Sequence, residues 1–281
     1  MSLPEGFDLD RFVADTLAED LGAGGDVTSN ATIAADASFA AAMNCREPIV
    51  VAGLDVAAAF FRALDPRVTI DRLASDGDRV EAGTVLMRLG GNARAMLAAE
   101  RSALNTLQHL SGIATLTRRY VDAIAGTGAV LLDTRKTIPG LRLLDKYGAR
   151  MGGAQNHRLR LDDGVLIKDN HVAVCGDVAE AVRRARAAET GLPVQVEVDR
   201  IEQIEPALAA GADRLLLDNM PPPTLREAVA RVAGRVPLEA SGGVNLETIR
   251  AIAETGVNFI SVGRITQSAP AVDIGLDYVL A

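Results

Sequence analysis

The chain has 281 residues, enough for one large domain or two ordinary ones with a sizeable core. An apolar fraction of 48% and a charged fraction of 23% are typical of a globular protein and argue against a disordered chain. The formal net charge of −8 argues against nucleic acid or an anionic membrane as a general partner, because both require a basic surface.

The first part of the chain predicts a helix and then a small antiparallel sheet. Residues 8–22 carry apolar side chains at helical spacing and end at a glycine, which indicates an amphipathic helix. Strand-like runs follow at 37–53 and 67–91, separated by an alanine-rich helix near 55–64. Asp-Gly turns and alternating polarity in the second run favour antiparallel pairing.

A long helical stretch covers roughly residues 93–126. We expect a break near Ser111–Gly112, because glycine is a poor helix former. We take this point as the boundary between a first domain, 1–111, and a second domain, 112–267.

From residue 128 onward, apolar runs with polar ends alternate with helix-compatible segments. Runs that are apolar on both faces and alternate with helices indicate a parallel sheet. Six such units, with a further strand expected near 148–153, predict a closed β/α barrel. The six runs are 129–137, 164–171, 193–199, 214–220, 236–243 and 258–266.

In such barrels the carboxyl ends of the strands meet at one mouth, where polar residues usually serve function. A group of basic residues follows the first two runs, and it predicts a polyanionic ligand. The alternative is that Asp133, Asp163 and Asp169 neutralise these residues as structural ion pairs. The basic residues are Arg135, Lys136, His157, Arg158, Lys168 and His171.

Acidic and glycine-containing strand ends complete the predicted mouth. Glu197 and Asp218 end successive runs and could coordinate Mg²⁺, hold ribose hydroxyls or stabilise a developing positive charge. The alternative is that either one only pairs with Lys168. Two glycine loops, 241–243 and 263–264, follow the last two runs and predict a phosphate site.

Motifs for several other chemistries are missing. The chain has no phosphate-binding loop of the Walker type, no G-x-S-x-G nucleophile and no zinc-type cluster. Cys45 and Cys175 lack metal-ligand spacing and are interpreted as packing residues. No apolar run reaches the roughly 20 residues that cross a bilayer, and the first ten residues lack signal-peptide features. We therefore expect a cytoplasmic location.

The order of several segments resembles the quinolinate phosphoribosyltransferase family. The segments are "AERSALNTLQHLSGIAT", "LLDTRKTIPGLRLLDKYGARMGGAQNHRLRLDDGVLIKDNH", "VEVD", "LLLDNM", "EASGGV" and "ISVGRIT". The resemblance implies an α/β fold with an N-terminal α/β sandwich and an open, TIM-like parallel β/α barrel of about seven strands. It also implies that the tail, 268–281, packs back on the first domain. The expected assembly is a homodimer, and pairs of subunits can assemble further into a hexamer.

The resemblance implies transfer of phosphoribosyl from phosphoribosyl diphosphate to quinolinate, with loss of CO₂ and a requirement for Mg²⁺. The products are nicotinate mononucleotide and diphosphate, in NAD synthesis. Arg135, His157 and Arg158 should contact the quinolinate carboxylates, and Arg101 should reach in from the partner subunit. No nucleic acid or membrane partner is expected.

The remaining roles implied by the resemblance concern the sugar donor. Lys136 and Lys168 should bind its phosphates, and Lys168 can neutralise the departing carboxylate. Glu197 and Asp218 should lie near the ribose and the Mg²⁺ ion. The residues expected to complete the substrate pocket are Thr134, His171, Ser241, Gly242, Gly243, Val262, Gly263 and Arg264.

Three other functions stay open. A paralogous family associated with molybdate transport shares this fold and much of the motif set, although two substrate carboxylates would explain the full basic set better. A class I aldolase would use Lys168 as a Schiff base, but its ionic neighbours favour ion pairing. A non-catalytic sensor of phosphoribosyl compounds would not need both Glu197 and Asp218.

Overall fold

The computed structural model describes residues 3–279, and these form two compact units. The first unit contains the residues up to Thr117, Leu143–Gly153 and the residues from Ser268 onward. The second unit contains Arg118–Arg142 and Ala154–Gln267.

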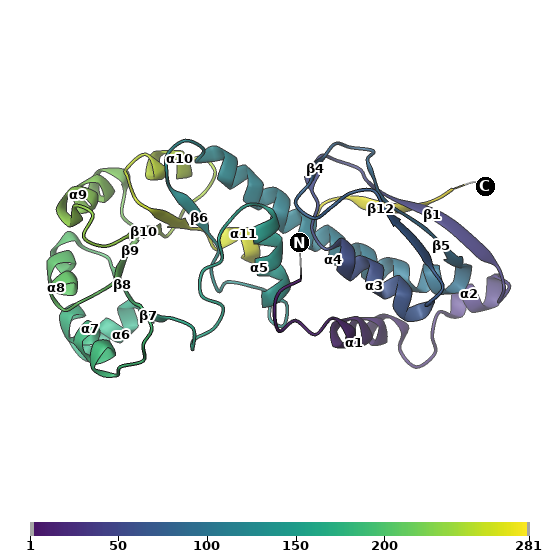
Figure 1. Ribbon diagram of the computed structural model, residues 1–281, viewed down its shortest axis with the longest axis horizontal. Coiled ribbons are helices and arrows are strands. Elements are labelled where there is room, and N and C mark those ends of the chain that lie inside the picture. The colour runs from purple at the N-terminus through teal and green to yellow at the C-terminus, as the bar shows by residue number, and fades with distance from the viewer. Residues whose placement is uncertain (1–2, 280–281) are drawn as a thin grey trace. The chain divides into compact units, whose positions relative to one another are not determined.

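A four-stranded antiparallel sheet organises the first unit, in the order β12-β1-β5-β3 (Figure 1). The edge strand β12 comes from the end of the chain, and its Leu276 lies opposite Met43 of β1. The antiparallel sheet and the helices predicted at 8–22 and 55–64 are confirmed. The strands are β1 Ser38–Cys45, β2 Ile49–Val50, β3 Thr69–Arg72, β4 Arg79–Val80, β5 Val85–Asn92 and β12 Ile274–Tyr278, and the helices are α1 Leu9–Leu21, α2 Val27–Thr32 and α3 Leu54–Leu64.

Local chemistry explains where α1 begins and ends. The Asp8 carboxylate accepts a hydrogen bond of 3.0 Å from the backbone N–H of Arg11, which caps the helix. Gly22 follows the last turn with a φ of +53°. Val13 and Leu17 form the buried face between these ends.

The long helix α4 runs without interruption from Ala93 to Ala123, so the break expected at Ser111–Gly112 is wrong. Within the first unit, a Cβ on Gly112 would lie 2.2 Å from the carbonyl oxygen of Pro270. The glycine therefore allows the chain near Pro270 to approach the helix, and it does not end the helix.

The second unit is built on a six-stranded parallel sheet, in the order β6-β11-β10-β9-β8-β7. All six predicted strands are confirmed, and β8 is buried along its whole length. The strands are β6 Val130–Leu132, β7 Val165–Ile167, β8 Val194–Val198, β9 Arg214–Asp218, β10 Leu238–Ser241 and β11 Phe259–Ser261.

Helices alternate with these strands, and α7 to α9 lie along the outer side of the curved sheet (Figure 1). The helices after β7 are α6 Asp169–Cys175, α7 Val178–Ala187, α8 Ile204–Ala209, α9 Pro222–Val232, α10 Ile249–Ala253 and α11 Arg264–Gln267, with a short 3-10 turn at Ile201–Gln203.

The parallel sheet is open, with β6 and β7 at its two edges in the part of the chain that the structure describes. This agrees with the open barrel that the resemblance implies, and the closed barrel predicted from the repeat alone is not found. The strand expected near 148–153 is also wrong, because these residues end the helix α5, Arg142–Met151. Shortly afterwards, Gln155 forms a single parallel bridge with Leu132. Among residues 3–279, no helix is both long and apolar enough to cross a membrane.

Candidate active site

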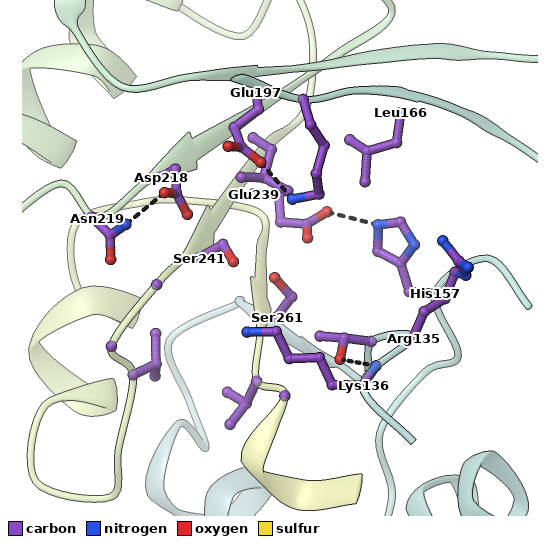
Figure 2. Close-up of a pocket in the computed structure, with 18 of the residues that line it drawn as sticks. Arg135, Lys136, His157, Leu166, Glu197, Asp218, Asn219, Glu239, Ser241 and Ser261 are labelled. Carbon is purple, nitrogen blue, oxygen red and sulfur yellow. Dashed lines mark hydrogen bonds and ion pairs between the residues drawn. The ribbon is translucent and has the colours of Figure 1, made fainter. Parts of the chain in front are cut away.

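A pocket lies at the carboxyl ends of the parallel strands, within the second unit (Figure 2). Most of the residues predicted from the sequence line it together, although they come from segments more than 100 residues apart. The predicted residues that line it are Thr134, Arg135, Lys136, His157, Arg158, Lys168, Glu197, Asp218, Ser241, Gly242, Gly243, Val262, Gly263 and Arg264.

Two predicted residues are not among those that line this pocket. Arg101 is exposed on α4, and its proposed contribution to a partner's site stays a prediction. His171 is exposed at the start of α6, where its Nδ1 accepts a hydrogen bond of 3.0 Å from the backbone N–H of Lys168. The imidazole of His171 therefore caps a helix in this structure.

One side of the pocket carries an excess of positive charge. The Nε atom of Arg135 is buried and has no hydrogen-bond partner among the described residues. Burial and the nearby charge of Arg135 lower the pKa of Arg158, whose Nη1 donates to the carbonyl of Gly164 at 2.8 Å. Two neighbouring guanidinium groups, one with an unused buried donor, are suited to binding a carboxylate or a phosphate.

Asp133 directly follows β6, is fully buried and supports the basic side of the pocket. Its carboxylate accepts hydrogen bonds from the backbone N–H of His157 at 2.7 Å and from Asn156 Nδ2 at 2.6 Å. These contacts give Asp133 a structural role through a backbone N–H and a side-chain amide, and its ion pairing with the basic residues stays a prediction. Asp133 fixes the segment that carries His157 and Arg158 against the strand that leads to Arg135.

The other side of the pocket carries two carboxylates. Lys168 Nζ lies 2.5 Å from Glu197 Oε2, so the alternative pairing of this glutamate with Lys168 is present. Burial and the charge of Glu197 raise the pKa of Asp218, while Lys168 and the Asn219 amide oppose part of this rise. A cation bound beside Asp218 would stabilise its charged form.

The donor set fits Mg²⁺ better than a transition metal. Mg²⁺ is commonly held by one or two carboxylates together with water and substrate phosphates. The described residues contain no cluster of three or more His, Cys, Asp or Glu side chains that could hold a metal alone. A bound magnesium ion would therefore depend on Glu197, Asp218 and oxygens of the substrate.

Close contacts require glycine at position 242 and leave little room for a side chain at position 263. Gly242 has a φ of +92°, and a Cβ there would lie 2.1 Å from Asn219 Oδ1. A Cβ on Gly263 would lie 2.7 Å from Lys136 Cδ. Glycine at these positions lets the backbone approach a ligand closely, as expected for a phosphate site.

Sequence reasoning missed Glu239, a pocket residue with a fully buried side chain. Its Oε2 accepts a hydrogen bond of 2.9 Å from Gln195 Nε2 and lies 3.5 Å from both His157 Nε2 and Arg214 Nε. The guanidinium of Arg214 also lies 3.8 Å from the centre of the Phe259 ring. Because alternate residues of a strand share a face, Glu239 could have been found as the residue two before Ser241.

Other lining residues were also outside the predicted set. They add polar groups at the strand ends and apolar walls between them. These residues are Leu166, Asp169, Leu216, Asn219, Val244, Asn245, Ser261 and Gln267.

Comparison with known proteins gives consistent matches over nearly the whole chain. The family model described as quinolinate phosphoribosyl transferase, N-terminal domain, matches residues 26–111, and the model of the C-terminal domain of the same family matches residues 113–277. A protein of Mycobacterium leprae named nicotinate-nucleotide pyrophosphorylase [carboxylating] is 46% identical, covering 93% of this chain and 94% of its own. A Bacillus subtilis protein with the same name, marked probable, is 42% identical over 94% of this chain and 91% of its own.

Solved structures agree with the sequence matches. The nicotinate-nucleotide pyrophosphorylase from Francisella tularensis superposes with a TM-score of 0.93 at 41% identity. The superposition covers 99% of this chain and all of that one. The likeness therefore includes both compact units.

Proposed function

The chain belongs to the quinolinate phosphoribosyl transferase family, and we propose that it forms nicotinate mononucleotide from quinolinate and phosphoribosyl diphosphate. Diphosphate and CO₂ are the other products, and the reaction serves NAD synthesis. The observation that carries this proposal is the division of one pocket into a basic side and an acidic, glycine-rich side. Two anionic substrates with different charged groups need such a division.

The basic side suits quinolinate, which carries two adjacent carboxylates. Arg135 and Arg158 supply planar guanidinium donors that match the geometry of a carboxylate. His157 lies in the same wall and is held by the backbone bond to Asp133. The ring nitrogen of quinolinate would then face the centre of the pocket.

The acidic side suits the sugar donor. The loops at Ser241–Gly243 and Gly263 would bind its 5′-phosphate, and Lys136 would bind another phosphate group. Glu197 and Asp218 would hold the ribose and stabilise the positive charge that develops on the sugar carbon. Both carboxylates also fit Mg²⁺, which when bound would neutralise charge on the leaving diphosphate.

The bond changes require no nucleophile from the protein. The pyridine nitrogen attacks the C1 carbon of the ribose, and the bond from that carbon to diphosphate breaks. The C2 carboxylate then leaves as CO₂, the electron pair left on C2 is stabilised by the adjacent cationic ring nitrogen, and C2 takes up a proton from water. Lys168 Nζ lies 2.5 Å from Glu197 Oε2, so its charge is held beside the acidic side of the pocket.

The proposal extends to assembly and location. A homodimer, with Arg101 reaching the partner's pocket, would explain why Arg101 is exposed on α4 in this chain. Pairs of subunits could assemble further into a hexamer. A cytoplasmic location is proposed because substrates with several negative charges do not cross a bilayer unaided.

The relatives support this activity over a molybdate-transport-associated protein, since those described above are named as pyrophosphorylases. The test is to incubate the chain with both substrates and Mg²⁺ and to measure nicotinate mononucleotide by chromatography. Product should require all three components. Binding of both substrates without product would support a sensor, and borohydride trapping of a substrate on Lys168 would support an aldolase.

A further inference from the structure

Asn219 has an unusual backbone conformation at the edge of the pocket. Its φ of +54° lies in the left-handed region, which only two other non-glycine residues of the described chain adopt, Glu189 and Ala233. Ala233 follows the last turn of α9, where this conformation is common. Asn219 instead follows β9 directly after Asp218 and lines the pocket.

Asn219 connects the ends of two neighbouring strands. Its side-chain Nδ2 donates to Asp218 Oδ2 at 2.5 Å, and its backbone N–H donates to the carbonyl of Ser241 at 2.8 Å. Figure 2 shows Asn219 beside Asp218, away from the basic wall that carries Arg135 and His157. One residue therefore contacts both the carboxylate of β9 and the loop that follows β10.

The fit between Asn219 and the glycine loop is close. A Cβ on Gly242 would lie 2.1 Å from Asn219 Oδ1 and 2.9 Å from its backbone nitrogen. The side chain of Asn219 thus occupies the space that a side chain at position 242 would need. Its position and that of the loop backbone depend on each other.

We propose that Asn219 is a positioning residue that fixes the direction of the Asp218 carboxylate and its spacing from the Ser241–Gly243 loop. The proposal rests on the proposed function, in which these two groups hold the ribose and the 5′-phosphate of one substrate. Asn219 need not touch that substrate, because it acts through its two neighbours. Loss of its amide should therefore weaken binding of the sugar donor and leave binding of quinolinate unaffected.

The substitution Asn219→Gly removes the side-chain amide but keeps the left-handed backbone conformation, so it tests the amide alone. Glycine adopts the left-handed conformation without strain, so the fold should be kept while the hydrogen bond to Asp218 is lost. Loss of a hydrogen bond to a charged group changes an equilibrium by roughly 10- to 100-fold. We expect the KM for phosphoribosyl diphosphate to rise at least about tenfold and kcat to fall, with the KM for quinolinate within about twofold of wild type.

Two further variants complete the test. Ala233→Gly makes the same kind of change at an exposed left-handed residue outside the pocket, and it should leave all kinetic constants unchanged. Asn219→Asp keeps the shape but replaces the amide donor with a carboxylate beside Asp218, so it should be at least as impaired as Asn219→Gly. Binding of phosphoribosyl diphosphate and of quinolinate, each with Mg²⁺, should also be measured by calorimetry.

The inference is overturned if Asn219→Gly or Asn219→Asp binds phosphoribosyl diphosphate as tightly as wild type. It is also overturned if affinity for both substrates falls equally, since that result indicates a general structural role. A wild-type chain that gives no product would instead contradict the proposed function, and the calorimetry would still decide the role of Asn219.

Discussion

Replacing Glu239 with glutamine removes a buried negative charge while nearly preserving the shape of the side chain. Glu239 is fully buried, and it lies 3.5 Å from a nitrogen of His157 and from a nitrogen of Arg214. Glutamine can still accept the hydrogen bond from Gln195. The substitution therefore leaves the guanidinium of Arg214 without its charged partner.

The expected loss of stability can be bounded from the geometry. Breaking a buried ion pair by removing one partner costs about 3–5 kcal/mol. The Nε and Nη2 atoms of Arg214 are buried and make no hydrogen bond within residues 3–279, but 23% of the side chain is exposed. Water can therefore compensate part of the charge, and we expect a loss of roughly 2 kcal/mol in the free energy of unfolding.

The loss should depend on pH with a definite sign. Burial alone would raise the pKa of Glu239, but hydrogen bonds from His157 and Gln195 and the charge of Arg214 lower it below the ordinary value of 4.5. A lowered pKa in the folded state gives stability that is fully present above 4.5 and is lost as pH falls through the folded value. The difference between wild type and Glu239→Gln should therefore be full at pH 7 and shrink below pH 4.5.

Urea unfolding at pH 7 and at acidic pH measures both effects. The matched control is Glu254→Gln, because Glu254 pairs with Arg250 at 2.6 Å on the same unit but its side chain is 52% exposed. An exposed pair contributes about 0–1 kcal/mol, so this control should change stability little. If Glu239→Gln were as stable as Glu254→Gln at pH 7, the argument for a charge-dependent core beneath the pocket would be wrong.

Three other predictions concern single contacts. Gly112→Ala should destabilise the chain by about 1–3 kcal/mol, measured by urea unfolding, because the added Cβ would meet the carbonyl of Pro270 at 2.2 Å; unchanged stability would show that α4 and this segment do not pack closely. Gly263→Ala should raise the KM for phosphoribosyl diphosphate more than that for quinolinate, because the added Cβ would lie 2.7 Å from Lys136 Cδ and displace that side chain. Equal changes in the two KM values would contradict this role of the loop. Arg135→Ala should raise the KM for quinolinate by roughly 10- to 100-fold, whereas Lys136→Ala should raise the KM for phosphoribosyl diphosphate. The reverse pattern would overturn the proposed division of the pocket between the two substrates.

The sequence predicts the repeating part of the fold well, because strands that are apolar on both faces and end in polar residues have a strong local signal. The ends of β8 and β9 place Glu197 and Asp218 in the pocket as expected. The strand expected near 148–153 is wrong because this segment was taken as one more unit of the repeat, whereas α5 continues to Met151. Close packing against Ala114 and Thr117 requires Gly152 just beyond that helix.

Residues whose role depends on contacts across the sheet were harder to predict. Gly112 looked like a helix breaker because its reason, the approach of Pro270, lies more than 150 residues away in the chain. Glu239 was not predicted as a site residue, because its importance comes from His157 and Arg214, which contact it only in the folded sheet. Asn219 carries no local signal beyond following Asp218.

The most direct test of the central claim uses quinolinate labelled with ¹⁴C in the C2 carboxylate. The chain is incubated with this substrate, phosphoribosyl diphosphate and Mg²⁺, and both labelled CO₂ and nicotinate mononucleotide are measured. The proposed function predicts one CO₂ for each mononucleotide, and no CO₂ when phosphoribosyl diphosphate is omitted. Tight binding of both substrates with neither product, or CO₂ release without the sugar donor, would contradict it.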